Sequence, residues 1–149
     1  MEKLHLYLVR HCESLGNREN IFQGQLDLDI SATGEKQLAL LALRFRNIPI
    51  DAVYSSPLKR AYKTAEAVDL YHSLPIIKLP ELMEVDVGAL SGMKLDKAFA
   101  DYPVFAEKWQ NSPLNCIFPE GETTAEVYDR AKKELARVKA DCMGKTAVI

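Results

Sequence analysis

Reactive side chains follow directly on an apolar run near the start of the chain. In "LYLVRHCESLGN", residues 6–17, the run leads into Arg10, His11, Cys12 and Glu13. An imidazole titrates near pH 6.5, and neighbouring cations favour its neutral, nucleophilic form. In a second cluster, "SSPLKR", Arg60 is predicted to lie near the start of a helix, where free amides and the guanidinium favour an anion. These residue types predict a phosphate site in which His11 attacks phosphorus.

Apolar patterns predict the strands that carry these clusters. Residues 4–9 are apolar on both faces, which predicts a strand buried on both sides. "DAVYSS" is predicted to be a second strand, and further strands are expected at 76–79 and 146–149. Residues 10–30 are expected to form a loop.

Caps and helical spacing predict three helices between these strands. Ser31 is the expected N-cap of the first, whose apolar side is Leu38, Leu41, Ala42 and Phe45. Ser56 and Pro57 are the expected N-cap and first position of the second, which buries Leu58, Ala61, Ala65 and Val68. Thr123 and Glu126 form a capping box for the third, which ends near Gly144 and buries Val127, Ala131, Leu135 and Val138.

Strands that alternate with helices predict an α/β domain with a mostly parallel sheet. A length of 149 residues suits a single domain. Ligands of such sheets bind beyond the carboxyl ends of the strands. If the first two strands are neighbours, the clusters around His11 and Arg60 meet there.

Composition excludes several classes of partner. The chain has 19 basic and 21 acidic side chains, so a surface for nucleic acid is not expected. Its three cysteines lack metal-type spacing and indicate reduced thiols in a cytoplasmic protein. The first apolar run is too short for a membrane span. A metal site formed by His5, His11 and Cys12 is disfavoured because no further ligands cluster nearby, and neither a metal nor another cofactor is expected.

Five motifs occur in a characteristic order along the chain. They are "RHCES" with Asn17, "FQGQLDLDISATGEKQ", "SSPLKRAYKTAE", "PELMEVDVGALSG" and "PEGET". This series resembles the histidine phosphatase superfamily, in the branch that includes cofactor-dependent phosphoglycerate mutases and small phosphomonoesterases. The resemblance implies a three-layer αβα fold and phosphoryl transfer through a phosphohistidine.

The resemblance also implies the role of each site residue. His11 would accept the phosphoryl group, and Glu84 would be the general acid that protonates the leaving oxygen and later helps to activate water. The implied phosphate pocket consists of Arg10, Asn17, Gln23, Gly24 and Arg60. Glu122 in "PEGET" has two interpretations: it holds the pocket arginines, or it is simply an acid near a helix N-terminus.

The chain departs from the family pattern at two points. Cys12 stands where most relatives have glycine, and its thiol is either acidified by the arginines or packed and inert. The family's second catalytic histidine, in a Ser-His-Gly-like motif after the last core strand, has no counterpart, since neither His5 nor His72 matches it. We therefore expect residues 1–149 to be a histidine phosphatase domain that is incomplete at its C-terminus. Self-association through the surface left exposed is also expected.

The stretch between Glu84 and "PEGET" is short, which favours a phosphomonoesterase over a mutase. Residues 109–131 resemble the small phosphatases that include the α-ribazole phosphatases. The expected substrate is a small phosphorylated metabolite, with sugar phosphates, nucleotides and phosphoglycerates all open. Two alternatives remain: transfer of the phosphoglycerate-mutase type, and a pseudoenzyme that binds phosphorylated ligands without turnover.

Overall fold

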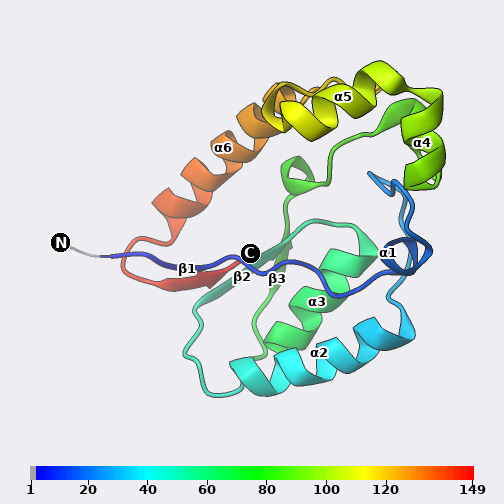
Figure 1. Ribbon diagram of the computed structural model, residues 1–149. Coiled ribbons are helices and arrows are strands. Elements are labelled where there is room, and N and C mark those ends of the chain that lie inside the picture. The colour runs from blue at the N-terminus through cyan, green and yellow to red at the C-terminus, as the bar shows by residue number, and fades with distance from the viewer. Residues whose placement is uncertain (1–2) are drawn as a thin grey trace.

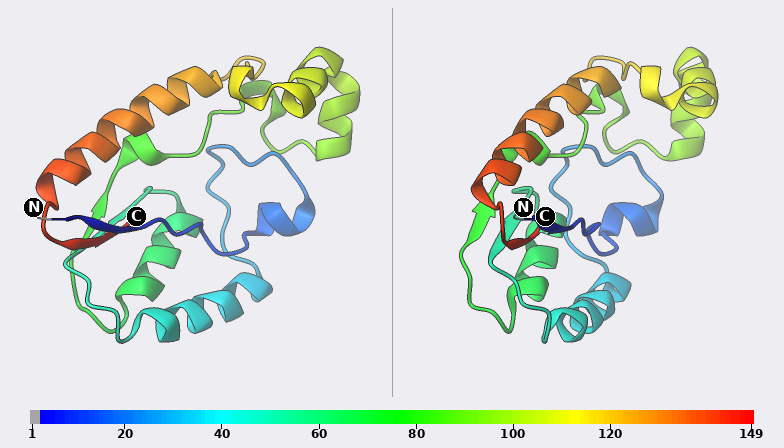
Figure 2. Two further views of the ribbon diagram at one scale, coloured as in Figure 1. Left: turned by 60° about the vertical axis from the view of Figure 1, so that its left-hand side comes forward. Right: turned by 90° about the vertical axis from the view of Figure 1, so that its left-hand side faces the viewer.

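The computed structural model describes residues 3–149, which form three layers, with a parallel sheet between two layers of helices. The strands are β1 (His5–Tyr7), β2 (Ala52–Ser55), β3 (Ile76–Lys78) and β4 (Thr146–Val148), in the order β1-β4-β2-β3. Helices α2 (Ala32–Phe45) and α3 (Lys59–Asp69) cover one face, and α6 (Thr124–Asp141) covers the other (Figure 1). The turned views of Figure 2 show the same separation of the helices by the sheet. The predicted αβα fold is confirmed.

Each face of the sheet has its own apolar core. Phe45 of α2, Val68 of α3 and Val148 of β4 pack together on one side. Tyr54, Leu79, Val138, Cys142 and Ala147 pack on the side of α6. The sheet residues Val53 and Ala147 are fully buried, as expected for central strands covered on both faces.

Two helices begin where their caps predict. Ser31 Oγ accepts a hydrogen bond from Gly34 N at 3.0 Å at the start of α2. At the start of α6, Thr123 and Glu126 form the reciprocal capping box. These ends are specified locally, so the sequence is sufficient to find them.

The predicted start of α3 was wrong by two residues. Leu58, not Ser56, is its N-cap, and no side chain of the helix caps it. Instead, Asp27 Oδ1 accepts a hydrogen bond from Lys59 N at 2.6 Å. A carboxylate from the loop before α2 therefore satisfies the first helical amide, which local sequence cannot reveal.

Two predictions about β1 were also wrong. The strand lies at the edge of the described sheet, and its residues are exposed rather than buried on both sides. Strand β4 lies between β1 and β2, so these two are not neighbours. Crossover connections let a strand late in the chain insert between earlier ones, and the two clusters still reach the same carboxyl edge.

The apolar side of α6 is less buried than predicted. Val138 is buried, but Val127 and Ala131 are only partly buried and Leu135 is 37% exposed. All three line a cavity beside the sheet, which accounts for their exposure.

The structure also contains short elements that the sequence did not predict. They are α1 (Leu15–Glu19), the 3-10 helices η1 (Pro80–Leu82), η2 (Gly88–Leu90) and η3 (Pro113–Asn115), and the helices α4 (Leu95–Asp101) and α5 (Pro103–Asn111). Phe22 contacts Phe105 and Trp109 edge to face, at 5.7 and 5.8 Å between ring centroids.

Among residues 3–149, no helix combines the length and apolar character needed to cross a bilayer.

Candidate active site

The backbone fixes the orientation of His11, in the loop that follows β1. His11 Nδ1 lies 2.7 Å from the carbonyl oxygen of Cys12. A carbonyl oxygen can only accept, so Nδ1 carries the proton in this bond and the neutral ring has its lone pair at Nε2. The nitrogen available for attack is therefore Nε2.

The surroundings of His11 favour its neutral form. Burial is the largest cause that lowers the pKa of His11 below its usual value, and the charges of Arg60 and Arg10 lower it further. The hydrogen bond with Cys12 and the charge of Glu84 act in the opposite direction. The lowered pKa means that the ring holds its lone pair at neutral pH.

Cys12 links the histidine loop to α3. Cys12 N donates to Thr64 Oγ1 at 3.0 Å, and Thr64 Oγ1 donates to the carbonyl of Arg60 at 2.7 Å. The thiol itself is buried, and burial raises the pKa of Cys12, so it stays protonated. This supports the interpretation of Cys12 as a packed, inert cysteine.

Arg60 is held by the predicted phosphate loop. Its side chain is buried, and Nη1 and Nη2 donate to the carbonyls of Leu26 and Gly24 at 2.9 and 2.8 Å. The remaining three of its five N–H groups have no partner within residues 3–149 and are free for an anion. Gly24 has φ +48°, and a Cβ there would lie 2.8 Å from the carbonyl oxygen of Val85. Glycine is thus required where the loop passes Val85.

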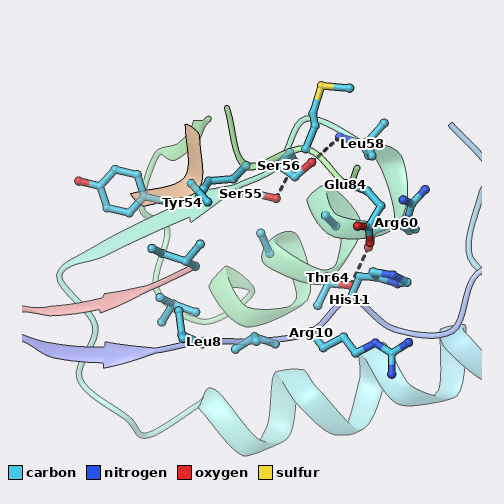
Figure 3. Close-up of a pocket in the computed structure, with 18 of the residues that line it drawn as sticks. Leu8, Arg10, His11, Tyr54, Ser55, Ser56, Leu58, Arg60, Thr64 and Glu84 are labelled. Atoms are coloured by element: carbon cyan, nitrogen blue, oxygen red, sulfur yellow. Dashed lines mark hydrogen bonds between the residues drawn. The ribbon is translucent and has the colours of Figure 1, made fainter. Parts of the chain in front are cut away.

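A cavity of about 540 Å³ brings His11, Arg60 and Glu84 together. Figure 3 shows these three side chains gathered at one end of the cavity, with Arg10 on the other side of His11. The carboxylate of Glu84 is exposed, and its Oε1 accepts from Val85 N at 3.0 Å. A carboxyl group is therefore available beside the predicted nucleophile.

The other predicted pocket residues occupy different places. Arg10 lines both this cavity and a neighbouring hollow, and Asn17 lines only the hollow. Gln23 is buried, with Oε1 accepting from Ser14 Oγ at 2.6 Å, and Gly24 holds Arg60 through its carbonyl. The structure thus groups Arg10, His11, Arg60 and Glu84, while Gln23 and Gly24 line neither the cavity nor the hollow.

Glu13, the last of the reactive residues after β1, joins the loop to α2. Its Oε1 accepts from Ser31 Oγ at 2.5 Å, and its amide donates to Gln37 Oε1 at 2.7 Å. The residues of "RHCE" therefore differ in their contacts. Arg10 and His11 line the cavity, whereas the amide of Cys12 bonds to α3 and Glu13 bonds to α2 and its N-cap.

Sequence reasoning missed Arg130 and left two interpretations of Glu122 open. Glu122 pairs with Arg130 at 2.8 Å and not with Arg10 or Arg60. Arg130 lies beside Ala131 on the side of α6 that was predicted to be apolar, and it lines the cavity. In the sequence, the signal that could have identified Arg130 is a single cation among the apolar residues of this helix side.

The assembled groups suit displacement at phosphorus. Nε2 of His11 supplies a lone pair, Arg60 and Arg10 supply positive charge, and Glu84 supplies a carboxyl group. Within the described residues, no three His, Cys, Asp or Glu side chains are placed to hold a metal ion.

Comparison with known proteins agrees with this chemistry. Residues 6–149 match the family model described as histidine phosphatase superfamily (branch 1). Phosphoserine phosphatase 1 of Hydrogenobacter thermophilus is 39% identical over 144 residues, which are 97% of this chain and 68% of that protein. A probable phosphoglycerate mutase, GpmB of Escherichia coli, is 33% identical over 132 residues, 89% of this chain and 61% of that protein. The solved structure of YhfR from Bacillus stearothermophilus superposes with a TM-score of 0.92 at 27% identity, covering 98% of this chain and 72% of that one.

The chain spans 61% to 68% of the length of these two curated relatives. One of them is named as a phosphatase and the other as a mutase, so the names support phosphoryl chemistry without selecting a substrate.

Proposed function

Because the chain belongs to the histidine phosphatase superfamily (branch 1), we propose that it hydrolyses phosphate monoesters of small metabolites through a phosphohistidine at His11. The observation that carries the proposal is the hydrogen bond from Nδ1 to the carbonyl of Cys12, which leaves the lone pair on Nε2. The name of the phosphoserine phosphatase relative supports a small phosphorylated substrate.

In the first step, Nε2 of His11 forms a bond to phosphorus as the ester P–O bond breaks. The leaving oxygen takes the electron pair of that bond and a proton from Glu84. Arg10 and Arg60 hold the non-bridging oxygens and stabilise the negative charge of the transition state.

In the second step, water attacks phosphorus and the P–N bond breaks, which returns the electron pair to Nε2. Glu84, now a carboxylate, accepts a proton from that water. The products are inorganic phosphate and the free alcohol, and both His11 and Glu84 return to their starting protonation states.

The acceptor in the second step separates hydrolysis from mutase chemistry. Transfer to an alcohol of a phosphoglycerate in place of water would make the protein a mutase, the activity that the name of its Escherichia coli relative gives. A protein that only binds would retain phosphate esters without forming the phosphohistidine.

A panel of phosphate monoesters tests the proposal. The protein should release inorganic phosphate from O-phosphoserine, sugar phosphates, nucleotides or 3-phosphoglycerate, and from 4-nitrophenyl phosphate. His11→Asn should abolish release, whereas His72→Asn should not, because His72 Nε2 lies 3.0 Å from Phe45 O, at the end of α2. Phosphate appearing on a second alcohol instead of in solution would favour the mutase, and binding without release would favour the pseudoenzyme.

A further inference from the structure

Arg130, on the second turn of α6, lies between that helix and the segment that carries Glu84. Its Nε and Nη2 donate to Glu122 Oε1 and Oε2, each at 2.8 Å. The side chains of Arg130 and Glu122 are only 15% and 24% exposed. A two-point pairing with a carboxylate fixes the plane of a guanidinium, so Arg130 has a defined orientation.

The same guanidinium holds three carbonyl groups of the Glu84 segment. Nη1 donates to the carbonyls of Glu81 and Met83 at 2.6 and 2.7 Å, and Nη2 donates to that of Glu84 at 3.2 Å. Residues 83–87 belong to no helix or strand, so no regular ladder fixes them. Gln25 Nε2 also reaches the carbonyl of Glu84, at 3.2 Å. The position of Glu84 therefore depends on side-chain donors.

Glu122, the partner of Arg130, is itself fixed by backbone. Asp86 N donates to Glu122 Oε2 at 2.9 Å, and Glu122 N donates to the carbonyl of Asp86 at 2.9 Å. A Cβ at Gly121 would lie 2.3 Å from the same carbonyl, so the two segments are in direct backbone contact. Arg130 thus contacts the segment at residues 81, 83 and 84, and Glu122 contacts it at Asp86, so the chain is held on both sides of Glu84.

We propose that Arg130 is a positioning residue that sets the place of the Glu84 carboxyl beside His11 by holding the carbonyls of residues 81, 83 and 84. This rests on the proposed function of Glu84 as the general acid. Arg130 acts through the backbone of Glu84, and its donors are already engaged by carbonyls and by Glu122.

The test compares two classes of substrate. Alkyl phosphates leave as basic oxygens that need a proton, whereas 4-nitrophenyl phosphate leaves readily without one. Arg130→Ala should lower kcat for alkyl phosphates by about 100-fold, the size expected from a displacement of about 1 Å, and much less for the nitrophenyl ester. Arg130→Lys, which keeps a charge but not the fork, should fall between, and it carries the test if the alanine variant does not fold.

Arg137→Ala is the matched control. Arg137 lies two turns further along α6, is 58% exposed and pairs with Glu134. This variant should leave the ratio of the two rates unchanged. In a Glu84→Gln background, Arg130→Ala should add almost nothing to the loss on alkyl phosphates, because no acid remains to be positioned.

Amide hydrogen exchange gives a readout that needs no turnover. Arg130→Ala should speed exchange at residues 83–87 and leave the sheet unchanged. Three results would overturn the positioning role of Arg130. They are equal losses of kcat on both substrates, a full additional loss of kcat in the Glu84→Gln background, or unchanged amide exchange at residues 83–87. If Glu84→Gln itself leaves the ratio of rates unchanged, the proposed general acid fails, and exchange alone then decides whether Arg130 fixes the segment.

Discussion

The two sides of the candidate site are built in different ways. On the phosphate side, His11, Cys12 and Arg60 are held by main-chain bonds and by Thr64 of a regular helix. On the acid side, Glu84 lies on an irregular segment, and its carbonyl accepts from the side chains of Arg130 and Gln25. The groups proposed to bind the phosphate are therefore held mainly by main-chain bonds and a regular helix, whereas the proposed proton donor depends on a few side chains. Substitutions on the two sides should therefore change the rates on alkyl and nitrophenyl esters differently.

Arg60→Ala should have a large effect on the phosphate side. Removing one preorganised donor to a transition state slows a reaction by about 100 to 1,000-fold. Because Arg60 acts on phosphate oxygens, alkyl and nitrophenyl esters should slow equally, unlike the selective loss expected on the acid side. Lys59→Ala is the control, because the Lys59 side chain is 58% exposed. A loss confined to alkyl esters would assign Arg60 to the acid side.

Thr64→Val tests the link between the histidine loop and α3. The change keeps the shape of the side chain and leaves the buried amide of Cys12 without its partner, which should lower the free energy of unfolding by about 1 to 3 kcal/mol. Urea unfolding measures this, with Thr33→Val on the exposed side of α2 as the control. If Thr64→Val is as stable as the control variant, the link does not support the loop.

The pH dependence of stability should show the smallest effect. The pKa of His11 in the folded protein lies below that of the unfolded chain, because burial disfavours the cation. As pH falls below about 6.5, the unfolded chain takes up this proton first, so the contribution of His11 to stability is present above that pH and is lost below it. His11→Gln should therefore lose less stability than the original protein between pH 7.5 and 5.5 in urea unfolding. An identical loss in both proteins would mean that the pKa of His11 is not lowered.

The same contrast separates what the sequence predicts from what it does not. The ends of α2 and α6 are determined by Ser31 and by the Thr123 capping box, which act within one turn, so both were found. The start of α3 depends on Asp27, which is distant in sequence. The exposure of β1 depends on its place at the sheet edge, which no local pattern encodes.

Within the site, short motifs give the residue types but not their supports. "RHCE" and "SSPLKR" identify His11 and Arg60, and the structure places both at one cavity. The contacts of Arg130 join residues 8 and 49 positions apart in the chain, which a one-dimensional pattern does not show. Hence the sequence was sufficient to predict that His11 and Arg60 lie together, but not the contacts that support Glu84.

The most direct test of the central claim is to locate the phosphoryl group on the protein. Rapid alkaline quenching after mixing with substrate should trap a phosphohistidine at His11, and phosphorus-31 NMR with peptide mapping should place it on Nε2. Nε2 is expected because Nδ1 donates its proton to the carbonyl of Cys12. Phosphate on Nδ1, on Cys12 or on a serine would contradict the account.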